Sequence, residues 1–290
     1  MIQSEKNVLI APYTHYKIGG VAREAYFPHN SGELLELLDT LKTSGTDYYI
    51  LGGGSNVLVG EGYFDGAAIL TIRMDSSQPF DDHIECGAGI KSTGIAETAL
   101  EQSKTGLEFL YLLPGTIGGA LAGNARYDNT NISEVLIDLV AVHPEKGLKT
   151  FTADDIVFEY KFNSLSSEGW LFCEASLKWE DGDPDTIRKR MDEIDANRSD
   201  SKHFELPSCG CIFKNDYNRN IRVGELIDSL GLKGLTIGGA QVASFHANFI
   251  VNTGNATSGD VLKLIEKLEQ TVLEKTGIKL DREVRILGNF

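Results

Sequence analysis

The spacing of hydrophobic residues predicts alternating helices and strands in the first half of the chain. Five leucines between Ser31 and Gly45 recur at helical spacing, so we expect an amphipathic helix with Ser31 as its cap and Gly45 at its end. Short apolar runs predict buried strands at residues 48–51, 57–59 and 66–72. This alternation is typical of a mixed fold of helices and strands.

The rest of the chain continues this mixture. A new helix is expected where Asp183 can act as the cap and Pro184 as the first helical residue. The pattern further predicts strands at 135–142 and 171–179, a helix near 222–230, short strands within 235–252, a helix at 258–276 and a last strand at 283–287. We therefore divide the chain into three units, 1–70, 71–185 and 190–290.

Composition and charge exclude several kinds of partner. The 290 residues are 41% hydrophobic and 24% charged, as in ordinary globular proteins. There are 42 Asp and Glu against 27 Lys and Arg, and the net charge of −15 argues against nucleic-acid or anionic membrane partners. No hydrophobic run approaches the roughly 20 residues that cross a bilayer, and no signal peptide is recognisable. We therefore expect a cytoplasmic protein, and nothing in the sequence implies an obligatory protein partner.

Two glycine-rich loops are candidate anion-binding sites. Residues 52–56 (Gly-Gly-Gly-Ser-Asn) lie between two predicted strands, and residues 114–120 (Pro-Gly-Thr-Ile-Gly-Gly-Ala) form a second loop that leads to Asn124. Glycines allow the backbone to approach an anion and to point successive N–H groups at it. Each loop alone could equally be a tight turn, because short glycine motifs often occur without a ligand. Two such loops favour a ligand with an extended polyphosphate, such as a dinucleotide.

The run Cys209-Gly210-Cys211 places two of the four cysteines one residue apart. A thiol at a glycine bend can donate a proton, attack, oxidise or bind a metal. A structural zinc needs four ligands at recognisable spacing, and the sequence has no second cysteine pair, so we expect no metal. The spacing also differs from Cys-x-x-Cys, the usual arrangement of a redox pair. Cys86 and Cys173 lie in predicted buried strands, which indicates a reducing compartment.

Several short motifs together resemble one known family. In family order they are Thr14-x-x-x-Ile18-Gly19-Gly20, Leu51-Gly-Gly-Gly-Ser-Asn56, Gly106-Leu-Glu-Phe109, Pro114-Gly-Thr-Ile-Gly-Gly119, Pro207-Ser-x-Gly-x-x-Phe-Lys-Asn215, Ile237-Gly-Gly239, His246-Ala-x-Phe-Ile-Val-Asn252 and Glu283-Val-Arg285. Each motif is weak alone, but the set covers essentially the whole chain. The sequence is similar to the UDP-N-acetylenolpyruvoylglucosamine reductases. Its compact C-terminal region resembles their shorter class, which lacks an extra loop and helix in the substrate domain.

The resemblance implies a flavoenzyme of peptidoglycan precursor synthesis. NADPH would reduce FAD, and the flavin would reduce the enolpyruvyl ether of UDP-N-acetylglucosamine to UDP-N-acetylmuramate. The implied fold is α+β, with two α/β FAD-binding domains of the vanillyl-alcohol-oxidase type and a C-terminal α+β substrate-binding domain. The units at 1–70 and 71–185 would then bind FAD, and the unit at 190–290 would bind the substrate.

For FAD, the resemblance points to both glycine-rich loops. The implied cofactor-binding residues are Gly52, Gly53, Gly54, Ser55, Asn56, Gly115, Thr116, Ile117, Gly118, Gly119 and Asn124. The segment that starts at Asn124 departs from the family pattern Asn-Ala-Gly-Ala-Tyr, because it reads Asn-Ala-Arg-Tyr.

The resemblance also implies three catalytic residues. Cys211 stands where the family has its proton-donating serine, and a thiol with an ordinary pKa of about 8.5 is a stronger acid than an alcohol; the alternative is a small packing residue. Lys161 is nearest to the family's enolate-stabilising arginine, but it lacks the bidentate fork, and it could instead be a solvated strand lysine. Glu283 matches the third catalytic residue, with a surface ion pair as the alternative. On its strand, Val284 and Ile286 are expected to face the core.

For the substrate diphosphate, position points to Lys214 and Asn215, which closely follow the candidate proton donor. Arg198 and Lys202 precede it, and they are either further phosphate ligands or ordinary surface charges. His246 is expected to form structural hydrogen bonds, because the histidines show no metal-ligand spacing.

Two other classes of function stay open. One is a different FAD-dependent oxidoreductase on the same scaffold. The other is a non-catalytic flavin-binding or UDP-sugar-binding relative, which a lysine in place of the family arginine would suit. The C-terminal motifs lie outside the flavin domains and match the substrate domain, so they favour the reductase.

Overall fold

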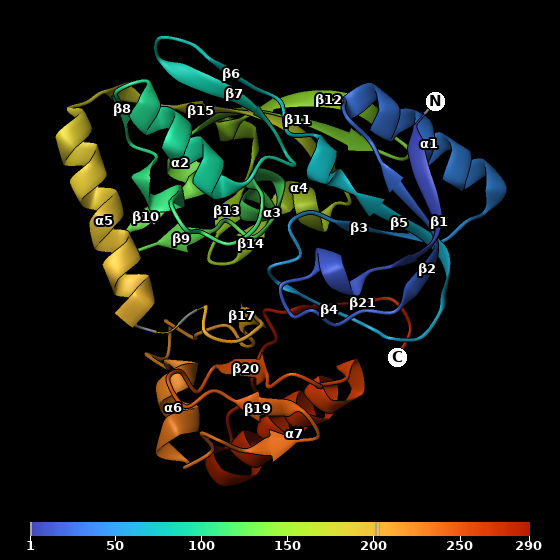
Figure 1. Cartoon of the computed structure of the whole chain (residues 1–290), viewed down its shortest axis with the longest axis vertical. Coiled ribbons are helices and arrows are strands. Elements are labelled where there is room, and N and C mark those ends of the chain that lie inside the picture. Colours follow the sequence, from blue (N-terminus) through green and yellow to red (C-terminus); the bar gives the residue numbers. More distant parts are fainter. Residues whose placement is uncertain (1, 201, 203) are drawn as a thin grey trace. The chain divides into compact units, whose positions relative to one another are not determined.

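The computed structural model describes residues 2–200, 202 and 204–290 (Figure 1). By their contacts these residues fall into two compact units, each assembled from segments that are distant in sequence. The first unit holds the residues up to Lys6, Glu24–Gly53 and Gly66–Asn197, and the second unit holds Asn7–Arg23, Gly54–Asp65 and Arg198–Phe290. The division into binding domains at 1–70, 71–185 and 190–290 stays a prediction, because contacts alone do not delimit binding domains.

A five-stranded antiparallel sheet lies at the centre of the first unit. Its order is β12 (Gly147–Thr152), β11 (Leu136–His143), β15 (Leu171–Lys178), β7 (His83–Gly87) and β6 (Ser77–Pro79). Cys173 on β15 and Cys86 on β7 are buried, as expected. Burial raises the pKa of both thiols to about 12, so these two cysteines act as packing residues.

Helix α1 (Ser31–Ser44) confirms the predicted leucine helix of the first unit. Its buried leucines share a hydrophobic cluster with Ala67. Gly45 ends the helix in a left-handed conformation with φ of +63°. The cap is Asn30 rather than Ser31, because the Asn30 side chain accepts the N–H of Glu33 at 2.9 Å. The strands beside it form a sheet of order β1 (Gln3–Leu9), β2 (Val21–Phe27), β5 (Phe64–Leu70) and β3 (Tyr48–Leu51).

The other helices of the first unit are short apart from α5. They are α2 (Ser92–Glu101), α3 (Ile117–Ala122), α4 (Ser164–Ser167) and α5 (Pro184–Asp200), of which residues up to Asn197 belong to this unit. Asp183 caps α5 as predicted, because its carboxylate accepts the N–H of Thr186 at 3.0 Å. Short strand pairs complete the unit: β8 (Lys104–Thr105) with β16 (Glu180–Asp181), β9 (Arg126–Tyr127) with β10 (Thr130–Asn131), and β13 (Phe158–Glu159) with β14 (Phe162–Asn163).

A four-stranded sheet and a long helix form most of the second unit. The strand order is β17 (Ser208–Cys211), β20 (Phe249–Asn252), β19 (Ala240–Val242) and β18 (Thr236–Ile237). Helix α7 (Ser258–Thr276) has the predicted bounds, and its apolar face packs in one cluster with Ile250 and Val242 of the sheet. The smaller elements are α6 (Val223–Ser229) and a parallel pair of β4 (Val57–Val59) with β21 (Arg285–Leu287).

The last strand departs from the expected alternation. Strand β21 starts at Arg285, and the N–H groups of Glu283 and Val284 before it both donate to the carbonyl of Ile212, at 2.7 and 3.3 Å. Val284 is buried as expected, but Ile286 is exposed, so the prediction that Ile286 faces the core is wrong. Two consecutive N–H groups that converge on one carbonyl interrupt the strand geometry, and this breaks the two-residue period.

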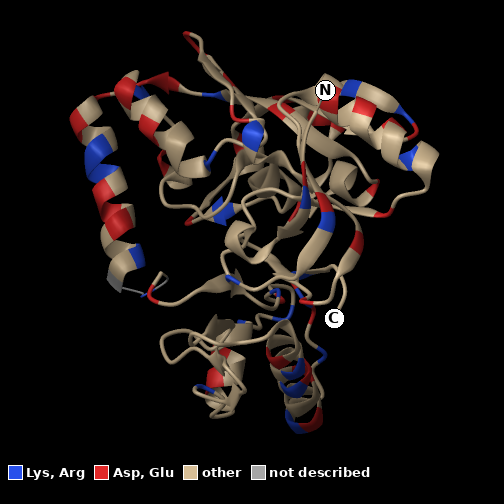
Figure 2. Cartoon of the chain, turned by 45° about the vertical axis from the view of Figure 1, so that its right-hand side comes forward, with Lys and Arg blue, Asp and Glu red and all other residues tan. Residues whose placement is uncertain are grey.

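The predicted α+β class is confirmed by these helices and largely antiparallel sheets, in which β3 with β5 and β21 with β4 are parallel pairs. Within the part of the chain that the structure describes, no helix is long and apolar enough to cross a membrane. Acidic and basic residues are interspersed along α7 (Figure 2), so the polar side of this helix has mixed charge.

Leu268 and Leu273 on α7 test the placement of this helix. Leu268 is 1% exposed and Leu273 is 50% exposed. Leu268→Ala should lower the free energy of unfolding by about 2–5 kcal/mol, because it removes buried methyl groups and leaves a cavity. Leu273→Ala should change it by less than about 0.5 kcal/mol. Urea unfolding followed by circular dichroism measures both values, and equal losses would contradict this packing.

Candidate active site

The two glycine-rich loops meet within the first unit. A side chain on Gly53 would place its Cβ 2.6 Å from the Cα of Gly115, and one on Gly52 would come within 2.8 Å of the Thr116 hydroxyl oxygen. Both distances are shorter than a van der Waals contact, so only glycine permits this approach. The N–H of Ser92, at the start of α2, donates to the Gly115 carbonyl at 3.2 Å. One ligand can therefore contact both loops.

Three buried polar atoms on or beside these loops have no hydrogen-bond partner among the described residues. They are the hydroxyl oxygens of Ser92 and Thr116 and the Oδ1 of Asn124. The Asn124 Nδ2 donates to the carbonyl of Glu159 at 3.1 Å, so Oδ1 is the side of this amide left for a ligand. Buried polar atoms without a partner cost free energy, and proteins usually satisfy them. Two hydroxyl donors and one acceptor fit FAD, which has phosphate oxygens and N–H groups.

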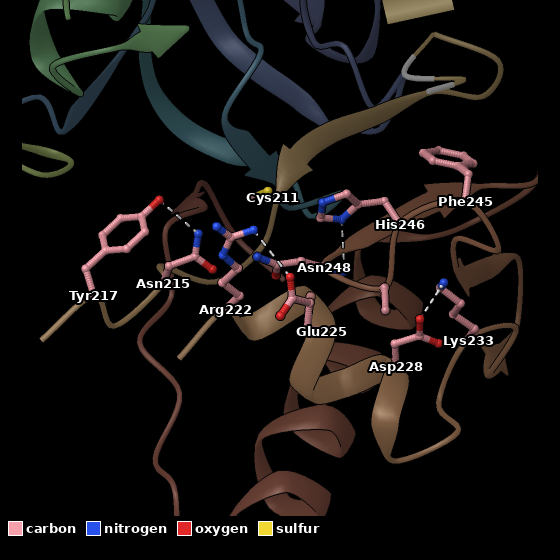
Figure 3. Close-up of a pocket in the computed structure, with 12 residues that line it drawn as sticks. Cys211, Asn215, Tyr217, Arg222, Glu225, Asp228, Lys233, Phe245, His246 and Asn248 are labelled. Carbon is pink, nitrogen blue, oxygen red and sulfur yellow. Dashed lines mark hydrogen bonds and ion pairs between the residues drawn. The ribbon is translucent and has the colours of Figure 1, made fainter. Parts of the chain in front are cut away.

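A pocket of about 470 Å³ opens in the second unit (Figure 3). Its lining carries a thiol, three aromatic rings and charged groups of both signs, from Cys211, Asn215, Tyr217, Arg222, Gly224, Glu225, Asp228, Lys233, Phe245, His246, Ala247 and Asn248. Lys233 and Asp228 form an ion pair at 2.7 Å, and Arg222 and Glu225 form one at 3.4 Å. The pocket is therefore concave and polar, and its cations have carboxylate neighbours.

The two neighbouring cysteines have different surroundings. Cys209 is buried in the main hydrophobic cluster of the second unit, where burial raises the pKa of its thiol and the Tyr16 hydroxyl lies close. Gly210 has φ of +79°, and the β17–β20 register is irregular between Ser208 and Cys211. Beyond this bend the Cys211 side chain lines the pocket. The bend therefore separates a packing cysteine from a cysteine that a ligand can reach.

The C-terminal segment runs beside the residues that follow Cys211. The carbonyl of Ile212 accepts the N–H of Glu283 at 2.7 Å, and the N–H of Lys214 donates to the carbonyl of Asp281 at 2.8 Å. Two of the predicted catalytic residues, Cys211 and Glu283, thus lie on paired segments of one unit.

Known proteins match this chain over nearly its whole length. Residues 202–287 match the family model of the UDP-N-acetylenolpyruvoylglucosamine reductase C-terminal domain, and residues 23–146 match that of an FAD-binding domain. A UDP-N-acetylenolpyruvoylglucosamine reductase of Limosilactobacillus reuteri is 33% identical over 99% of this chain and 96% of its own length. The chain belongs to the UDP-N-acetylenolpyruvoylglucosamine reductase family.

Two further members of the reductase family show the same extent of likeness. A UDP-N-acetylenolpyruvoylglucosamine reductase of Oceanobacillus iheyensis is 33% identical over 99% of this chain and 94% of its own length. The crystal structure of UDP-N-acetylenolpyruvylglucosamine reductase from Thermus caldophilus is 29% identical, with a TM-score of 0.82 over 99% of this chain and 100% of that chain. The family resemblance that the motifs predict is confirmed.

The end of the first glycine-rich loop belongs to the second unit of this reductase-family chain. Gly54, Ser55 and Asn56 are grouped there by their contacts. Gly54 has φ of +65°, and a Cβ on it would lie 2.1 Å from the carbonyl oxygen of Tyr13. The Asn56 Nδ2 donates to the carbonyl of Glu283 at 3.2 Å. These contacts are with protein backbone, and the role of the three residues in FAD binding stays a prediction.

The second glycine-rich loop leads into α3. The N–H groups of Ile117 and Gly118 donate to the carbonyls of Ile90 and Ala88, at 3.0 and 2.9 Å. A side chain on Gly118 would place its Cβ 2.7 Å from that of Ala88. These two positions provide close packing and use their N–H groups on backbone, and the assignment of Ile117, Gly118 and Gly119 to FAD binding stays a prediction.

The predicted substrate-binding residues are scattered in the second unit. Asn215 lines the pocket, and its Oδ1 accepts the N–H of Val223 at the start of α6, at 2.9 Å. Lys202 is exposed, with its Nζ 3.6 Å from a carboxylate oxygen of Glu205, and Arg198 is buried near the end of α5. Lys202 and Arg198 are not among the described residues that line the pocket. Lys214 is not among them either.

Lys161 lies in the first unit, in the turn between β13 and β14. Its φ of +54° is uncommon for a residue with a side chain. The adjacent strand is held by Asn163, whose Nδ2 donates to the carbonyl of Leu121 at 3.1 Å and whose Oδ1 accepts the N–H of Leu165 at 2.9 Å. The turn is therefore fixed, and its role in place of the family arginine stays a prediction.

Sequence reasoning missed three groups that the structure brings to these sites. The Ser92 hydroxyl was not predicted as a ligand, because a serine at a helix start looks like a cap. Arg222 and Lys233 were not predicted as pocket residues, because isolated cations in a sequence look like surface charges. The only sequence feature that could have indicated them is their closeness to the matched family motifs. His246 forms the expected structural hydrogen bond, in which its Nδ1 accepts the N–H of Asn248 at 3.3 Å, and it also lines the pocket.

Removal of the Thr116 hydroxyl tests the cofactor site. Thr116→Val keeps the shape and deletes one buried donor, so the affinity of the apoprotein for FAD should fall about tenfold. Thr271→Val is the control, because the Thr271 hydroxyl donates to the Lys267 carbonyl at 2.7 Å on α7. Titration of flavin fluorescence measures both affinities. A wild-type affinity in Thr116→Val would contradict the assignment of this hydroxyl.

His246 should make the stability of the protein depend on pH. Burial, with a smaller contribution from the Lys233 charge, lowers the pKa of His246 in the folded protein. The unfolded chain therefore takes up this proton first as the pH falls, and stability declines below about pH 6.5. His246→Gln removes this titration, so the variant should lose less unfolding free energy than the wild type between about pH 7 and about pH 5.5. Parallel losses in urea unfolding would contradict the expectation.

Proposed function

We propose that this protein reduces the enolpyruvyl ether of UDP-N-acetylglucosamine to UDP-N-acetylmuramate, with FAD as cofactor and NADPH as hydride source. The observation that carries the proposal is the Cys211 thiol on the pocket, on a segment paired with that of Glu283, in a chain whose relatives are named for this reduction. The reaction belongs to peptidoglycan precursor synthesis. Its nucleotide-sugar substrate and NADPH are small molecules of the cytoplasm, where we expect the protein to act without a protein or nucleic-acid partner.

The first unit would hold the cofactor. The hydroxyl groups of Ser92 and Thr116 and the Oδ1 of Asn124 are buried and oriented by their own elements, and they offer FAD the two donors and one acceptor described above. When bound, FAD supplies the hydride. The close contact of Gly53 with Gly115 keeps side chains out of this region, so the backbone itself can border the ligand.

Cys211 would supply the proton. Reduction of the enol ether leaves negative charge at its carboxylate end and requires one proton at the carbon that bears the carboxylate. The S–H bond of Cys211 breaks as the new C–H bond forms, which leaves a thiolate that water reprotonates. An ordinary thiol has a pKa of about 8.5 and is mostly protonated at neutral pH, so it is ready to act as an acid.

The negative charge that develops on the substrate needs a cation or a donor. Lys161 is our candidate for this role, because its amine carries the charge of the family arginine on a turn that is held in place. Glu283 is our candidate for a second acid, because its backbone N–H is anchored to the residue after Cys211.

The substrate diphosphate would bind at the pocket of the second unit. Asn215 offers an amide there, and Arg222 and Lys233 offer positive charge. Their carboxylate neighbours Glu225 and Asp228 hold these side chains in place. The dianionic diphosphate would compete for the same donors, which explains how an acidic protein can bind an anionic ligand.

Purification and steady-state assay test the whole proposal. The protein should show the absorption spectrum of bound flavin, and it should oxidise NADPH rapidly only when UDP-N-acetylglucosamine enolpyruvate is present. A protein that neither retains nor binds added FAD would refute the flavoenzyme. A yellow protein that is inert toward this substrate would refute the reductase and favour another oxidoreductase on the same scaffold.

The proton donor is tested by Cys211→Ala. This variant should keep the wild-type rate of flavin reduction by NADPH, and its flavin reoxidation by the enol ether should slow by about 100-fold or more, because a positioned acid contributes about 10²–10⁴. Cys209→Ala is the matched control, because that thiol is buried in the hydrophobic cluster and should leave both rates near those of the wild type. Stopped-flow absorbance measures each half-reaction, and equal losses in both would count against Cys211 as the acid.

A further inference from the structure

Asn248 holds the backbone that follows Cys211. Its side chain is 2% exposed, and both edges of its amide bind Phe213: Oδ1 accepts the Phe213 N–H at 3.0 Å, and Nδ2 donates to the Phe213 carbonyl at 2.8 Å. The carbonyl of Asn248 accepts the N–H of Ile212 at 2.9 Å. An amide bound on both edges has a single orientation. One residue thus fixes three backbone groups of two consecutive residues.

Regular pairing between β17 and β20 ends where the Asn248 side chain begins to bind the backbone. The β17–β20 ladder is irregular after Ser208, and Cys211 opposite Phe249 is its last pair. Ile212 and Phe213 lie beyond this pair and are buried, so their backbone groups need partners inside the protein. The Asn248 amide gives Phe213 the donor and the acceptor that a neighbouring strand would otherwise provide.

The segment that Asn248 holds carries the groups used by the proposed reaction. Cys211, the proposed proton donor, directly precedes it. The Ile212 carbonyl within it accepts the N–H of Glu283 at 2.7 Å. A displacement of Ile212 and Phe213 would therefore move the thiol and the glutamate together.

Asn248 also orients a ring on the pocket. Its N–H donates to the Nδ1 of His246 at 3.3 Å, so the neutral imidazole carries its proton on Nε2. The ring packs on Gly224, where a Cβ would lie 3.1 Å from the His246 Cε1. Cys211, His246 and Asn248 all border the pocket (Figure 3). Asn248 thus connects the backbone that bears the thiol to a second polar group of the same pocket.

We infer that Asn248 is the positioning residue of the proton donor: its amide sets the location of the Cys211 thiol for delivery of a proton to the substrate. The inference rests on the proposed role of Cys211. Loss of the amide slows proton delivery and leaves the reduction of the flavin by NADPH unchanged, because the hydrogen bonds of Asn248 to other described residues go to Ile212, Phe213 and His246 rather than to the loops that would bind the cofactor.

Half-reaction kinetics of the holoenzyme test this inference. In Asn248→Ala, flavin reduction by NADPH should keep the wild-type rate, and flavin reoxidation by the enol ether should slow by about 10- to 100-fold, because small displacements of a catalytic group cost this much. The solvent deuterium isotope effect on reoxidation should rise, because proton transfer becomes the slow step. A wild-type rate of reoxidation would overturn the inference.

Asn252→Ala is the matched control. Asn252 is also a buried amide that binds backbone, because its Nδ2 donates to the Tyr16 carbonyl at 3.1 Å and its Oδ1 accepts the N–H groups of Gly254 and Ala256 at 2.9 and 3.0 Å. This variant loses similar hydrogen bonds in the same unit, but none of them reaches Phe213. It should keep the wild-type ratio of the two half-reactions. The same slowing of reoxidation in both variants would show general destabilisation and would overturn the inference.

Asn248→Asp provides a test that does not depend on the alanine variant folding. A protonated carboxyl group has a donor and an acceptor, as the amide has, whereas an ionised one has acceptors only. Burial favours the protonated form. Reoxidation relative to the wild type should therefore recover as the pH falls. A ratio that does not change with pH would count against the role of the amide.

Alkylation separates a failure of this inference from a failure of the proposed function. If the enol ether does not reoxidise the wild-type holoenzyme, the reductase proposal fails, and the reactivity of Cys211 toward iodoacetamide, followed by peptide mapping, still reports its environment. In Asn248→Ala the alkylation time profile at a fixed pH should become faster, because the segment that follows the thiol loses the hydrogen bonds that hold it, while Asn252→Ala should match the wild type. Identical profiles in all three proteins would overturn the positioning role.

Discussion

The backbone pairing around Ile212 and Phe213 is the interaction on which the second unit depends. These buried residues bind Asn248 on one side and Glu283 and Val284 on the other, with an isolated bridge between Phe213 and Arg282. Arg282 is in turn held by two hydrogen bonds to Glu269 on α7, at 2.6 and 2.7 Å. A candidate acid and a candidate glutamate that are far apart in sequence thus lie on adjoining segments, because the core of the unit uses the same backbone.

The first unit is built on a different constraint. Its glycine-rich loops approach so closely that side chains are excluded at Gly53 and Gly118, while the hydroxyl groups of Ser92 and Thr116 are buried without a partner among the described residues. In the second unit the corresponding buried amides, such as Asn248, satisfy both of their edges within the protein. The first unit therefore has buried polar atoms that can still bind a ligand, whereas the buried amide of Asn248 in the second unit is already used to hold the backbone beside the candidate proton donor.

Local sequence patterns, such as hydrophobic periodicity and helix caps, predict much of the fold. The predictions that are wrong or missing concern contacts between residues that are distant in sequence. The bounds of α7 follow from helical periodicity and from the capping box of Thr257. Ile286 was placed in the core because the two-residue period was extended through a segment whose N–H groups bind the distant carbonyl of Ile212. The candidate site shows the same difference between features that local sequence predicts and features that depend on distant contacts. The family motif points to Cys211 as the candidate proton donor, whereas the inferred role of Asn248 depends on a backbone 35 residues away that no local pattern specifies.

The order in which the second unit can fold follows from the pairing of β4 with β21. The N–H groups of Gly60 and Gly62 donate to the carbonyls of Leu287 and Asn289 at 2.8 and 2.9 Å, so an early segment of the chain is completed by a very late one. At synthesis rates of about 5–20 residues per second, the early segment lacks this pairing for roughly 10–45 s on the ribosome. The second unit must therefore finish folding after translation of residues 285–289. Until then β4 is an unpaired strand edge, which is the kind of surface that chaperones protect from wrong association.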